Sequence, residues 1–240
     1  CYSGQVATPY PGYTPMIVKF DEHQKMPTTR IEYSYYLMAV DAGLQMMPSR
    51  LLEGEQTAHF LTERFDRRNG KKVHIQTLAA MNPSADSYEA LFEVACRIGV
   101  PPGELRQLFR SMVLHVLGGN GEDHNKNFSF LMGNDGGWHV APAYDYTFSV
   151  DPDAPYYVNR HSMTVNNKTE GIAAEDLMEV ARRYGIKAAE PFIEKAIGIV
   201  SRYPEYGREA GVGEEWIKTI EKEITARVEC VSDNRTGRLK

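Results

Sequence analysis

Cysteine pairs, long apolar runs and an excess of basic residues are all missing from this 240-residue sequence, and each absence narrows its function. The three cysteines, Cys1, Cys96 and Cys230, form no C-x-x-C pair, which argues against a zinc ribbon or thiol redox motif and favours a reducing compartment. No stretch approaches the roughly 18 apolar residues of a membrane span, and no charged-then-apolar signal segment opens the chain. With 27 basic and 32 acidic side chains and a net charge of -5, direct contact with nucleic acid is not expected. The sequence therefore predicts a soluble, cytoplasmic protein.

Enough apolar sequence is present for one large domain or two small lobes, since 42% of the residues are hydrophobic. Residues 16–20 form a short apolar run with one embedded lysine, Lys19, and predict a buried strand. Thr29 and Glu32 have the spacing of a capping box, which predicts a helix over residues 29–41. A lysine in such a strand needs a partner.

Two candidate antiparallel strands follow, over residues 49–53 and 59–66. Together with the preceding strand and helix they predict a small mixed α+β lobe, assigned to residues 1–68. Beyond residue 68 the pattern is mainly helical, and residues 69–240 are assigned to a second lobe. Its predicted elements are helices over residues 87–98, 103–117, 174–184, 188–202 and 214–231, and a hairpin of strands over residues 128–132 and 138–141.

The stretch that carries chemistry is the glycine-flanked loop over residues 118–128. Glu122 and Asn127 lie five residues apart in it, and Asp145 follows after the predicted hairpin. Protein kinases use this order: an acid orients the attacking hydroxyl, and an asparagine and a later aspartate hold magnesium against the nucleotide phosphates. Amide, carboxylate and phosphate oxygens are the hard ligands that magnesium prefers.

Plainer interpretations exist for each of these residues. A loop rich in Gly, Asn and Asp is most often a turn, and His124 and Lys126 are more often solvated than catalytic. Lys19 can snorkel at a sheet edge, and Glu32 suits the third position of a capping box. Lys19 and Glu32 also match the kinase order of a phosphate-binding lysine and the helical glutamate that pairs with it.

Several motifs in one order resemble the HipA-like serine/threonine kinases of bacterial toxin–antitoxin systems. The loop reads GEDHNKNFSFL over residues 121–131, followed by APAYD over residues 141–145, with ERFDR upstream over residues 63–67. In that family the loop usually reads D-x-H-x-K-N-F-S and precedes a P-x-Y-D or P-x-F-D element. The resemblance covers about residues 15–170.

The resemblance implies a protein-kinase-like two-lobed fold, with ATP and Mg²⁺ as cofactors and a protein serine or threonine as acceptor. It also implies an antitoxin partner and, in the best-known relatives, an aminoacyl-tRNA synthetase as target. Carried over to this sequence, the implied catalytic residues are Glu122, Asp123, His124 and Lys126; the implied ATP-binding residues are Lys19, Glu32 and the hinge residues Arg64, Phe65 and Asp66; and the implied metal ligands are Asn127 and Asp145.

Two departures from the family pattern stand out. Five positions before Asn127 the family carries Asp, whereas this chain has Glu122 with Asp123 beside it. We expect Glu122 to act as a working variant of that Asp; the alternatives are that Asp123 substitutes for it or that the enzyme is slow. The glycine-rich phosphate loop that precedes the lysine strand in the family is not supplied by residues 3–6. We expect that loop and an N-terminal subdomain to lie upstream, to have been removed, or to be on a separate polypeptide. We therefore expect the small N-terminal lobe to be incomplete at its start.

These departures leave three hypotheses open. The first is an active protein kinase. The second is a catalytically impaired kinase-like module that acts by binding an antitoxin partner. The third is a small-molecule kinase, since enzymes acting on aminoglycosides or choline share the acid, the asparagine and the later aspartate.

Overall fold

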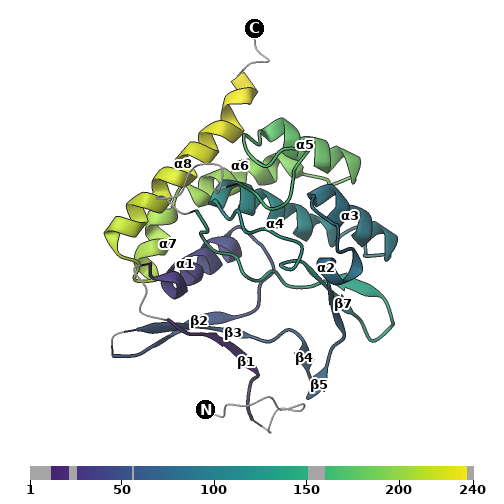
Figure 1. Cartoon of the computed structure of the whole chain (residues 1–240), viewed down its shortest axis with the longest axis horizontal. Helices are drawn as coiled ribbons and strands as arrows, with labels where there is room; N and C mark the ends of the chain where they lie inside the picture. The colour runs from purple at the N-terminus through teal and green to yellow at the C-terminus, as the bar shows by residue number, and fades with distance from the viewer. Residues whose placement is uncertain (1–11, 22–25, 56, 151–159, 237–240) are drawn as a thin grey trace.

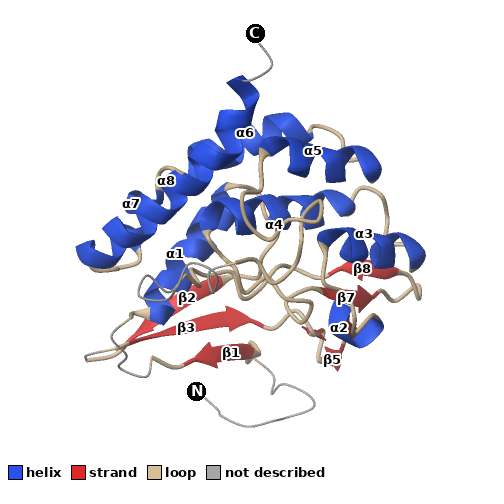
Figure 2. Ribbon diagram, turned by 45° about the horizontal axis from the view of Figure 1, so that its top comes forward, coloured by secondary structure: helices blue, strands red, loops and turns tan. Residues whose placement is uncertain are grey.

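The computed structural model describes residues 12–21, 26–55, 57–150 and 160–236 and shows a mixed α/β fold (Figure 1). The small sheets lie along one side of the molecule and the helices pack over the other (Figure 1, Figure 2). Residues 3–6, the stretch compared with a glycine-rich loop, fall outside the described residues.

The N-terminal sheet has the strand order β1-β3-β2. It consists of β1 (Met16–Lys19), β2 (Ser49–Glu53) and β3 (Ala58–Glu63), with β3 antiparallel to both neighbours. The helix α1 (Thr28–Asp41) packs against β2 and β3, and its fully buried residues such as Tyr35 enter the core. The strand–helix–strand–strand order predicted for residues 16–66 is therefore observed. The prediction that the first strand is buried is wrong, because Ile17 and Val18 of β1 are exposed.

The capping box predicted for α1 is wrong. The N-cap position is Pro27, and no side chain caps the helix. Thr29 is buried, and its Oγ1 donates instead to the carbonyl oxygen of Ala58 on β3, at 2.6 Å. Glu32 is committed to Lys19, at 2.7 Å. Contacts with the sheet compete for both side chains, so they attach the helix to β1 and β3 rather than cap its end.

A second group of strands follows the first sheet. The chain forms a two-stranded ribbon and then a three-stranded antiparallel sheet of order β6-β7-β8. The elements are β4 (Arg67–Arg68), β5 (Lys71–Lys72), β6 (Ile75–Thr77), α2 (Leu78–Met81), β7 (Ser129–Met132) and β8 (Trp138–Val140). The β7–β8 hairpin was predicted from the glycine-rich turn between its strands, whereas β4, β5, β6 and α2 were not predicted.

Helices supply most of the regular structure and enclose one continuous core. They are α3 (Tyr88–Arg97), α4 (Leu105–Gly118), α5 (Ala174–Arg183), α6 (Ala189–Val200), α7 (Tyr203–Glu209) and α8 (Glu214–Thr236). The single helix predicted over residues 188–202 ends at Val200, and α7 was missed. None of the helices in the described part of the chain is both long and apolar enough to cross a membrane.

The central helix is α4, which contacts α3, α6 and α8. Eleven of its 14 residues are buried, more than the one apolar stripe that the sequence predicts. Full burial of a large apolar side chain stabilises the folded state by about 1.5–3 kcal/mol. The buried residues of α4 therefore hold the helix in place, and with it the start of the loop at its C-terminal end. Its C-cap is Gly119, whose φ of +69° suits glycine, and the acid-rich loop begins there.

Candidate active site

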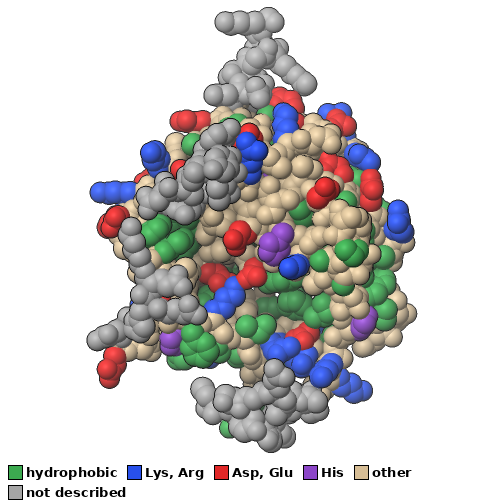
Figure 3. Space-filling view, in the orientation of Figure 1, with side chains coloured by type: hydrophobic (Ala, Val, Ile, Leu, Met, Phe, Trp, Pro, Cys, Tyr) green, Lys and Arg blue, Asp and Glu red, His purple; other side chains and the backbone are tan. Residues whose placement is uncertain are grey.

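Three charged residues from distant parts of the chain meet beside the N-terminal sheet. Lys19 ends β1, Glu32 lies in α1, and Asp145 lies in the loop after β8. The Lys19 Nζ donates to Glu32 Oε1 at 2.7 Å and also to Asp145 Oδ1. Acidic, basic and histidine side chains gather in the middle of the face shown in Figure 3. We call Lys19, Glu32 and Asp145 the Lys19 cluster.

The charges in the Lys19 cluster shift each other's pKa values. Burial raises the pKa of Glu32 to about 7, against the opposing effect of the Lys19 ammonium group. Burial alone would lower the pKa of Lys19, but Glu32 and Asp145 together raise it above its usual value. Lys19 is therefore cationic, while its own side chain and that of Asp145 stay 39% and 43% exposed. A ligand can reach both groups.

Asp145 is held in an uncommon backbone conformation. Its φ is +56°, in the left-handed region that aspartate tolerates better than most residues at a cost of about 1–2 kcal/mol. The buried side chain of Asn120 donates through Nδ2 to the Asp145 carbonyl oxygen at 3.3 Å. This contact ties the loop after α4 to the loop after β8. Asn120 was not singled out from the sequence.

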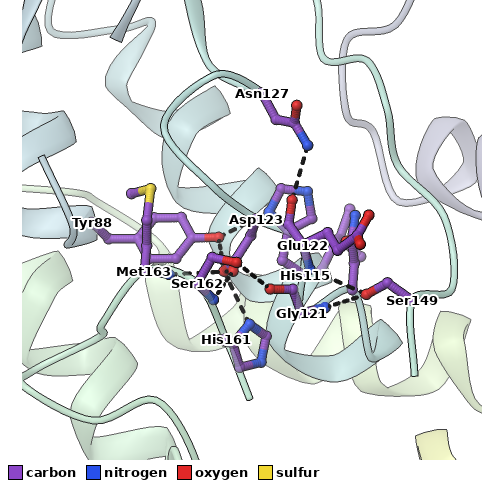
Figure 4. Close-up of polar contacts among 12 residues, drawn as sticks. Tyr88, His115, Gly121, Glu122, Asp123, Asn127, Ser149, His161, Ser162 and Met163 are labelled. Carbon is purple, nitrogen blue, oxygen red and sulfur yellow. Dashed lines mark hydrogen bonds and ion pairs between the residues drawn. The ribbon is translucent and has the colours of Figure 1, made fainter. Parts of the chain in front are cut away.

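Glu122 is exposed, but its backbone is fixed on both sides. Its N–H donates to Ser149 Oγ at 3.1 Å, and its carbonyl oxygen accepts from Asn127 Nδ2 at 2.9 Å (Figure 4). With the Asn127 Nδ2 used in this way, the amide oxygen points away from the Glu122 carbonyl (Figure 4). Among the described residues no side-chain hydrogen bond or ion pair holds the acid group of Glu122, so it is exposed on a fixed backbone.

Asp123, the next residue, is fully buried. It accepts from Tyr88 Oη at 2.8 Å, from His161 Nδ1 at 2.9 Å, and from the backbone amides of Ser162 and Met163 at 2.8 and 3.4 Å (Figure 4). Burial would raise the pKa of Asp123, but the hydrogen bonds and the neighbouring His161 hold it below its usual value. We call these five residues the Asp123 network. No oxygen of Asp123 reaches solvent, whereas Glu122 is exposed.

His124 and Lys126 have exposed side chains in the same loop. Within the described residues neither side chain makes a hydrogen bond or an ion pair, and only their backbone carbonyls are used, by Asn127 N and by Tyr144 Oη. Both side chains face solvent beside Glu122 and Asn127 along the chain. Their catalytic roles stay predictions.

The predicted hinge connects β3 to β4. Arg64 and Asp66 form a two-pronged pair, with Nε and Nη2 of Arg64 at 2.8 and 2.7 Å from the two carboxylate oxygens, and Arg67 also contacts Asp66. The Phe65 ring lies 5.7 Å from the ring of Tyr144, the residue before Asp145. The hinge thus touches the same loop that carries Asp145. Its contacts with adenine and ribose stay predictions.

The residues present fit a magnesium ion carried by a nucleotide. Within the described residues no group of three or more His, Cys, Asp or Glu side chains is arranged to hold a metal ion alone. Mg²⁺ is usually bound by one or two protein ligands together with water and substrate phosphates. One carboxylate from Asp145 and one amide oxygen from Asn127 match that donor set. Lys19, which contacts Asp145, matches a phosphate.

Sequence reasoning missed the residues that hold the loop in place. Tyr88, Ser149 and His161 contact it from 27 or more residues away along the chain. A tyrosine at a helix start and a serine or histidine in a polar stretch carry no local signal for such contacts. Only the fold brings them together.

Comparison with solved structures defines the class of fold. The Helicobacter pylori proinflammatory kinase CtkA is similar at a TM-score of 0.60 and 15% identity, over 97% of this chain and 94% of that chain. HipA from Shewanella oneidensis MR-1, solved with HipB and operator DNA, is similar at a TM-score of 0.71 and 18% identity. That match covers 94% of this chain and 63% of that chain, so this chain spans less than two thirds of the HipA chain. At these identities the likeness shows the fold, which is kinase-like.

Comparison with family models then gives the family. The model of the HipA-like C-terminal domain matches residues 5–205, most of the chain. The chain therefore belongs to the HipA-like C-terminal domain family, and the resemblance predicted from the loop motifs is confirmed. Comparison with curated protein sequences finds no match.

Proposed function

We propose that this protein is a serine/threonine protein kinase of the HipA-like toxin class, which transfers the γ-phosphate of ATP to a protein hydroxyl with Mg²⁺. The observation that carries the proposal is Lys19, which bridges Glu32 and Asp145 from three separate segments. A cation held between a buried helical glutamate and a half-exposed aspartate is the arrangement that kinases use for nucleotide phosphates. The kinase-like fold supports the proposal.

Each residue of the site then has a role. Bound ATP supplies the phosphoryl group, and Mg²⁺ neutralises its charge. Lys19 binds the phosphates while Glu32 orients it, and Asn127 and Asp145 hold the metal. Glu122 orients the acceptor hydroxyl and receives its proton as the acceptor oxygen bonds to the γ-phosphorus and ADP leaves.

The hinge residues complete the proposed nucleotide site. The backbone of Arg64 and Phe65 meets adenine, and Asp66 lies near the ribose. The exposed His124 and Lys126 side chains assist at the acceptor side of the loop. Lys126 is one residue before the metal ligand Asn127, so its charge favours a phosphoryl group being transferred.

Partners are proposed from the family. The Shewanella HipA structure contains HipB and operator DNA, which supports an antitoxin protein as partner of this chain. A separately supplied N-terminal subdomain is a further proposed partner, and an aminoacyl-tRNA synthetase is a proposed target. We place the protein in the cytoplasm and propose no direct nucleic-acid contact of its own.

Radiolabelled phosphate transfer tests the proposal. Purified protein is incubated with [γ-³²P]ATP, Mg²⁺ and a cell lysate as source of acceptors, beside Asn127→Ala. We expect labelled serine or threonine in the wild type and at least about a 100-fold loss in the variant, because the metal loses a ligand. Equal labelling by both proteins, or none by either, rules the kinase out.

One observation favours a second candidate, a kinase-like module that binds ATP poorly and works through its antitoxin partner. Glu122 is one methylene longer than the family's aspartate, and a misplacement of about 1 Å in a positioning group costs on the order of 100-fold in rate. A thermal-shift titration with MgATP discriminates, since a ligand at 100 times its dissociation constant stabilises by about 2.7 kcal/mol. A shift that Asp145→Ala removes favours the enzyme, and no shift favours the module.

A further inference from the structure

The Asp123 network lies directly behind the proposed base. Glu122 points to solvent while Asp123, its neighbour, points inward and accepts hydrogen bonds from α3 and from residues 161–163 (Figure 4). Both His161 and Asp123 are nearly sealed, with side chains 8% and 0% exposed. A buried carboxylate keeps its charge only where donors compensate for lost water. This one has four of them.

The network continues to the central helix. His115 Nδ1 lies 2.8 Å from Tyr88 Oη. Burial lowers the pKa of His115 to about 4, so the ring is neutral near pH 7. A tyrosine has one hydroxyl proton, and Tyr88 gives it to Asp123, so His115 Nδ1 must carry the hydrogen and donate to Tyr88. The donors therefore run in one direction, from α4 through α3 to Asp123.

The same carboxylate joins two backbone segments that touch each other. The Ser162 N–H donates both to Asp123 Oδ1 and to the Gly121 carbonyl oxygen, at 2.8 and 2.9 Å, and Ser162 Oγ donates to that carbonyl at 2.8 Å. A Cβ on Gly121 would lie 2.7 Å from the Arg160 carbonyl oxygen, closer than side chains pack. Residues 121–123 and 160–163 therefore form one unit around Asp123.

We propose that Asp123 and His161 are positioning residues, which fix Glu122 in the orientation that phosphoryl transfer needs and align it with residues 160–163. The inference rests on the proposed kinase function. It assigns Asp123 no contact with substrate and gives His161, which was not identified from the sequence, a defined role. The hydrogen bond from His161 Nδ1 to Asp123 is the contact that matters most, because it brings the only side chain of the downstream segment that reaches this carboxylate within the described residues.

The first test is Asp123→Asn in the whole chain, with Asp176→Asn as a matched control. Asp176 is also a buried carboxylate, held by Asn166, Lys168 and the amide of Ala173, each at 2.8 Å, but it lies at the start of α5. Both variants lose a buried charge and stability. We expect kcat for transfer from MgATP to myelin basic protein to fall on the order of 100-fold in Asp123→Asn only.

The affinity for MgATP separates positioning from general damage. Its dissociation constant should stay within about twofold of wild type in Asp123→Asn, because Lys19, Asn127 and Asp145 are unchanged. A fall in kcat of similar size in Asp176→Asn, or an unchanged kcat in Asp123→Asn, overturns the proposal. So does a loss of MgATP binding that matches the loss of rate.

His161 gives an independent pair of variants. An asparagine side chain places its amide nitrogen near the Nδ1 position, so His161→Asn keeps the donor to Asp123, whereas His161→Ala removes it. We expect His161→Asn to retain kcat within about threefold and His161→Ala to lose roughly tenfold. Equal rates in the two variants contradict the proposed hydrogen bond.

A measurement without catalysis separates this proposal from the kinase function itself. Amide hydrogen exchange of residues 119–123 and 160–163 should become at least about tenfold faster in Asp123→Asn and stay unchanged in Asp176→Asn. If wild type transfers no phosphate but the exchange result holds, the kinase function fails and the coupling of the two segments stands. If exchange in these residues is unchanged, the proposal fails whatever the activity.

Discussion

The Lys19 cluster and the Asp123 network both contact the loop after α4, but they stabilise their charged groups in opposite ways. In the Lys19 cluster one cation serves two carboxylates, and the side chains of Lys19 and Asp145 remain accessible. In the Asp123 network one carboxylate receives four donors and is cut off from solvent. In the Lys19 cluster a ligand can replace one ion-pair partner. In the Asp123 network the same exchange would break buried hydrogen bonds.

This difference supports the different roles that we propose for two neighbouring acids in one loop. Glu122 and Asp123 are adjacent acids, but Glu122 is exposed and Asp123 is buried, and the role toward the acceptor is proposed for Glu122 alone. The fixed backbone of Glu122 depends on contacts with Ser149 and Asn127, and it is supported from behind by Asp123. Each side of the comparison can be tested by substitution, beginning with the largest expected effect.

Replacement of Asp145 by alanine should have the largest effect on function. It removes the proposed metal ligand and one of the two anions that hold Lys19. We expect phosphate transfer to fall by about 100- to 1,000-fold and the thermal shift with MgATP to disappear. Glu221→Ala, at an exposed position on α8, is the control and should behave as wild type. Undiminished transfer in Asp145→Ala would remove Asp145 from the site.

Glu32 should make the Lys19 cluster sensitive to rising pH. Its folded-state pKa of about 7 lies above the ordinary 4.5, so the folded protein holds a proton that the unfolded chain releases between these values. The free energy of unfolding of wild type relative to Glu32→Gln should therefore fall by about 1–3 kcal/mol as pH rises from 4.5 to 7.5. Urea unfolding of both proteins across this range measures it. A constant difference contradicts the raised pKa.

His115 should give the Asp123 network the opposite pH dependence, with stability lost as the pH falls. Its folded-state pKa of about 4 lies below the ordinary 6.5, so the unfolded chain takes up a proton that the folded protein refuses. Stability should fall by about 1–3 kcal/mol as pH falls from 6.5 to 4, relative to His115→Asn, which keeps a donor to Tyr88 but does not titrate. Urea unfolding of the two proteins at both pH values is the measurement. If the difference in their free energies of unfolding is the same at pH 6.5 and pH 4, this histidine is not held neutral.

Two glycines should respond differently to alanine. At Gly121 the new Cβ meets a backbone carbonyl at 2.7 Å, whereas at Gly198 in α6 it meets nothing within 4 Å. We expect Gly121→Ala to destabilise by about 1–3 kcal/mol and to slow transfer, and Gly198→Ala to stabilise by about 0.5–1 kcal/mol. Chemical denaturation of both variants is the measurement. Similar effects at the two positions would mean that residues 121 and 160 are not in contact.

The sequence predicted the parts of this protein that follow local patterns. The apolar spacing of α4 and the glycine-rich turn between β7 and β8 were visible as period and turn chemistry. The motif order also predicted that Lys19, Glu32 and Asp145 belong to one site, and the structure brings their side chains together. Their roles toward a nucleotide stay predictions.

The features that the sequence did not reveal depend on contacts between distant residues. Thr29 and Glu32 have the residue types and spacing of a capping box, but the Thr29 hydroxyl donates to the Ala58 carbonyl oxygen on β3 instead of capping the helix. His161 lies 38 residues from Asp123, and nothing near either residue indicates the pair. The sequence did not reveal that Asp123 is buried while Glu122 is exposed, because the direction of side chains within a loop has no fixed period.

The most direct test of Glu122 as the base is single-turnover transfer from [γ-³²P]ATP, with saturating Mg²⁺, by wild type and Glu122→Gln. Glutamine keeps the size of the side chain and the fixed backbone but cannot receive the acceptor proton. We predict transfer slower by on the order of 100-fold in Glu122→Gln, with an unchanged MgATP dissociation constant. Transfer by Glu122→Gln at the wild-type rate would contradict this role, because the exposed acid of this loop would then have no part in the chemistry.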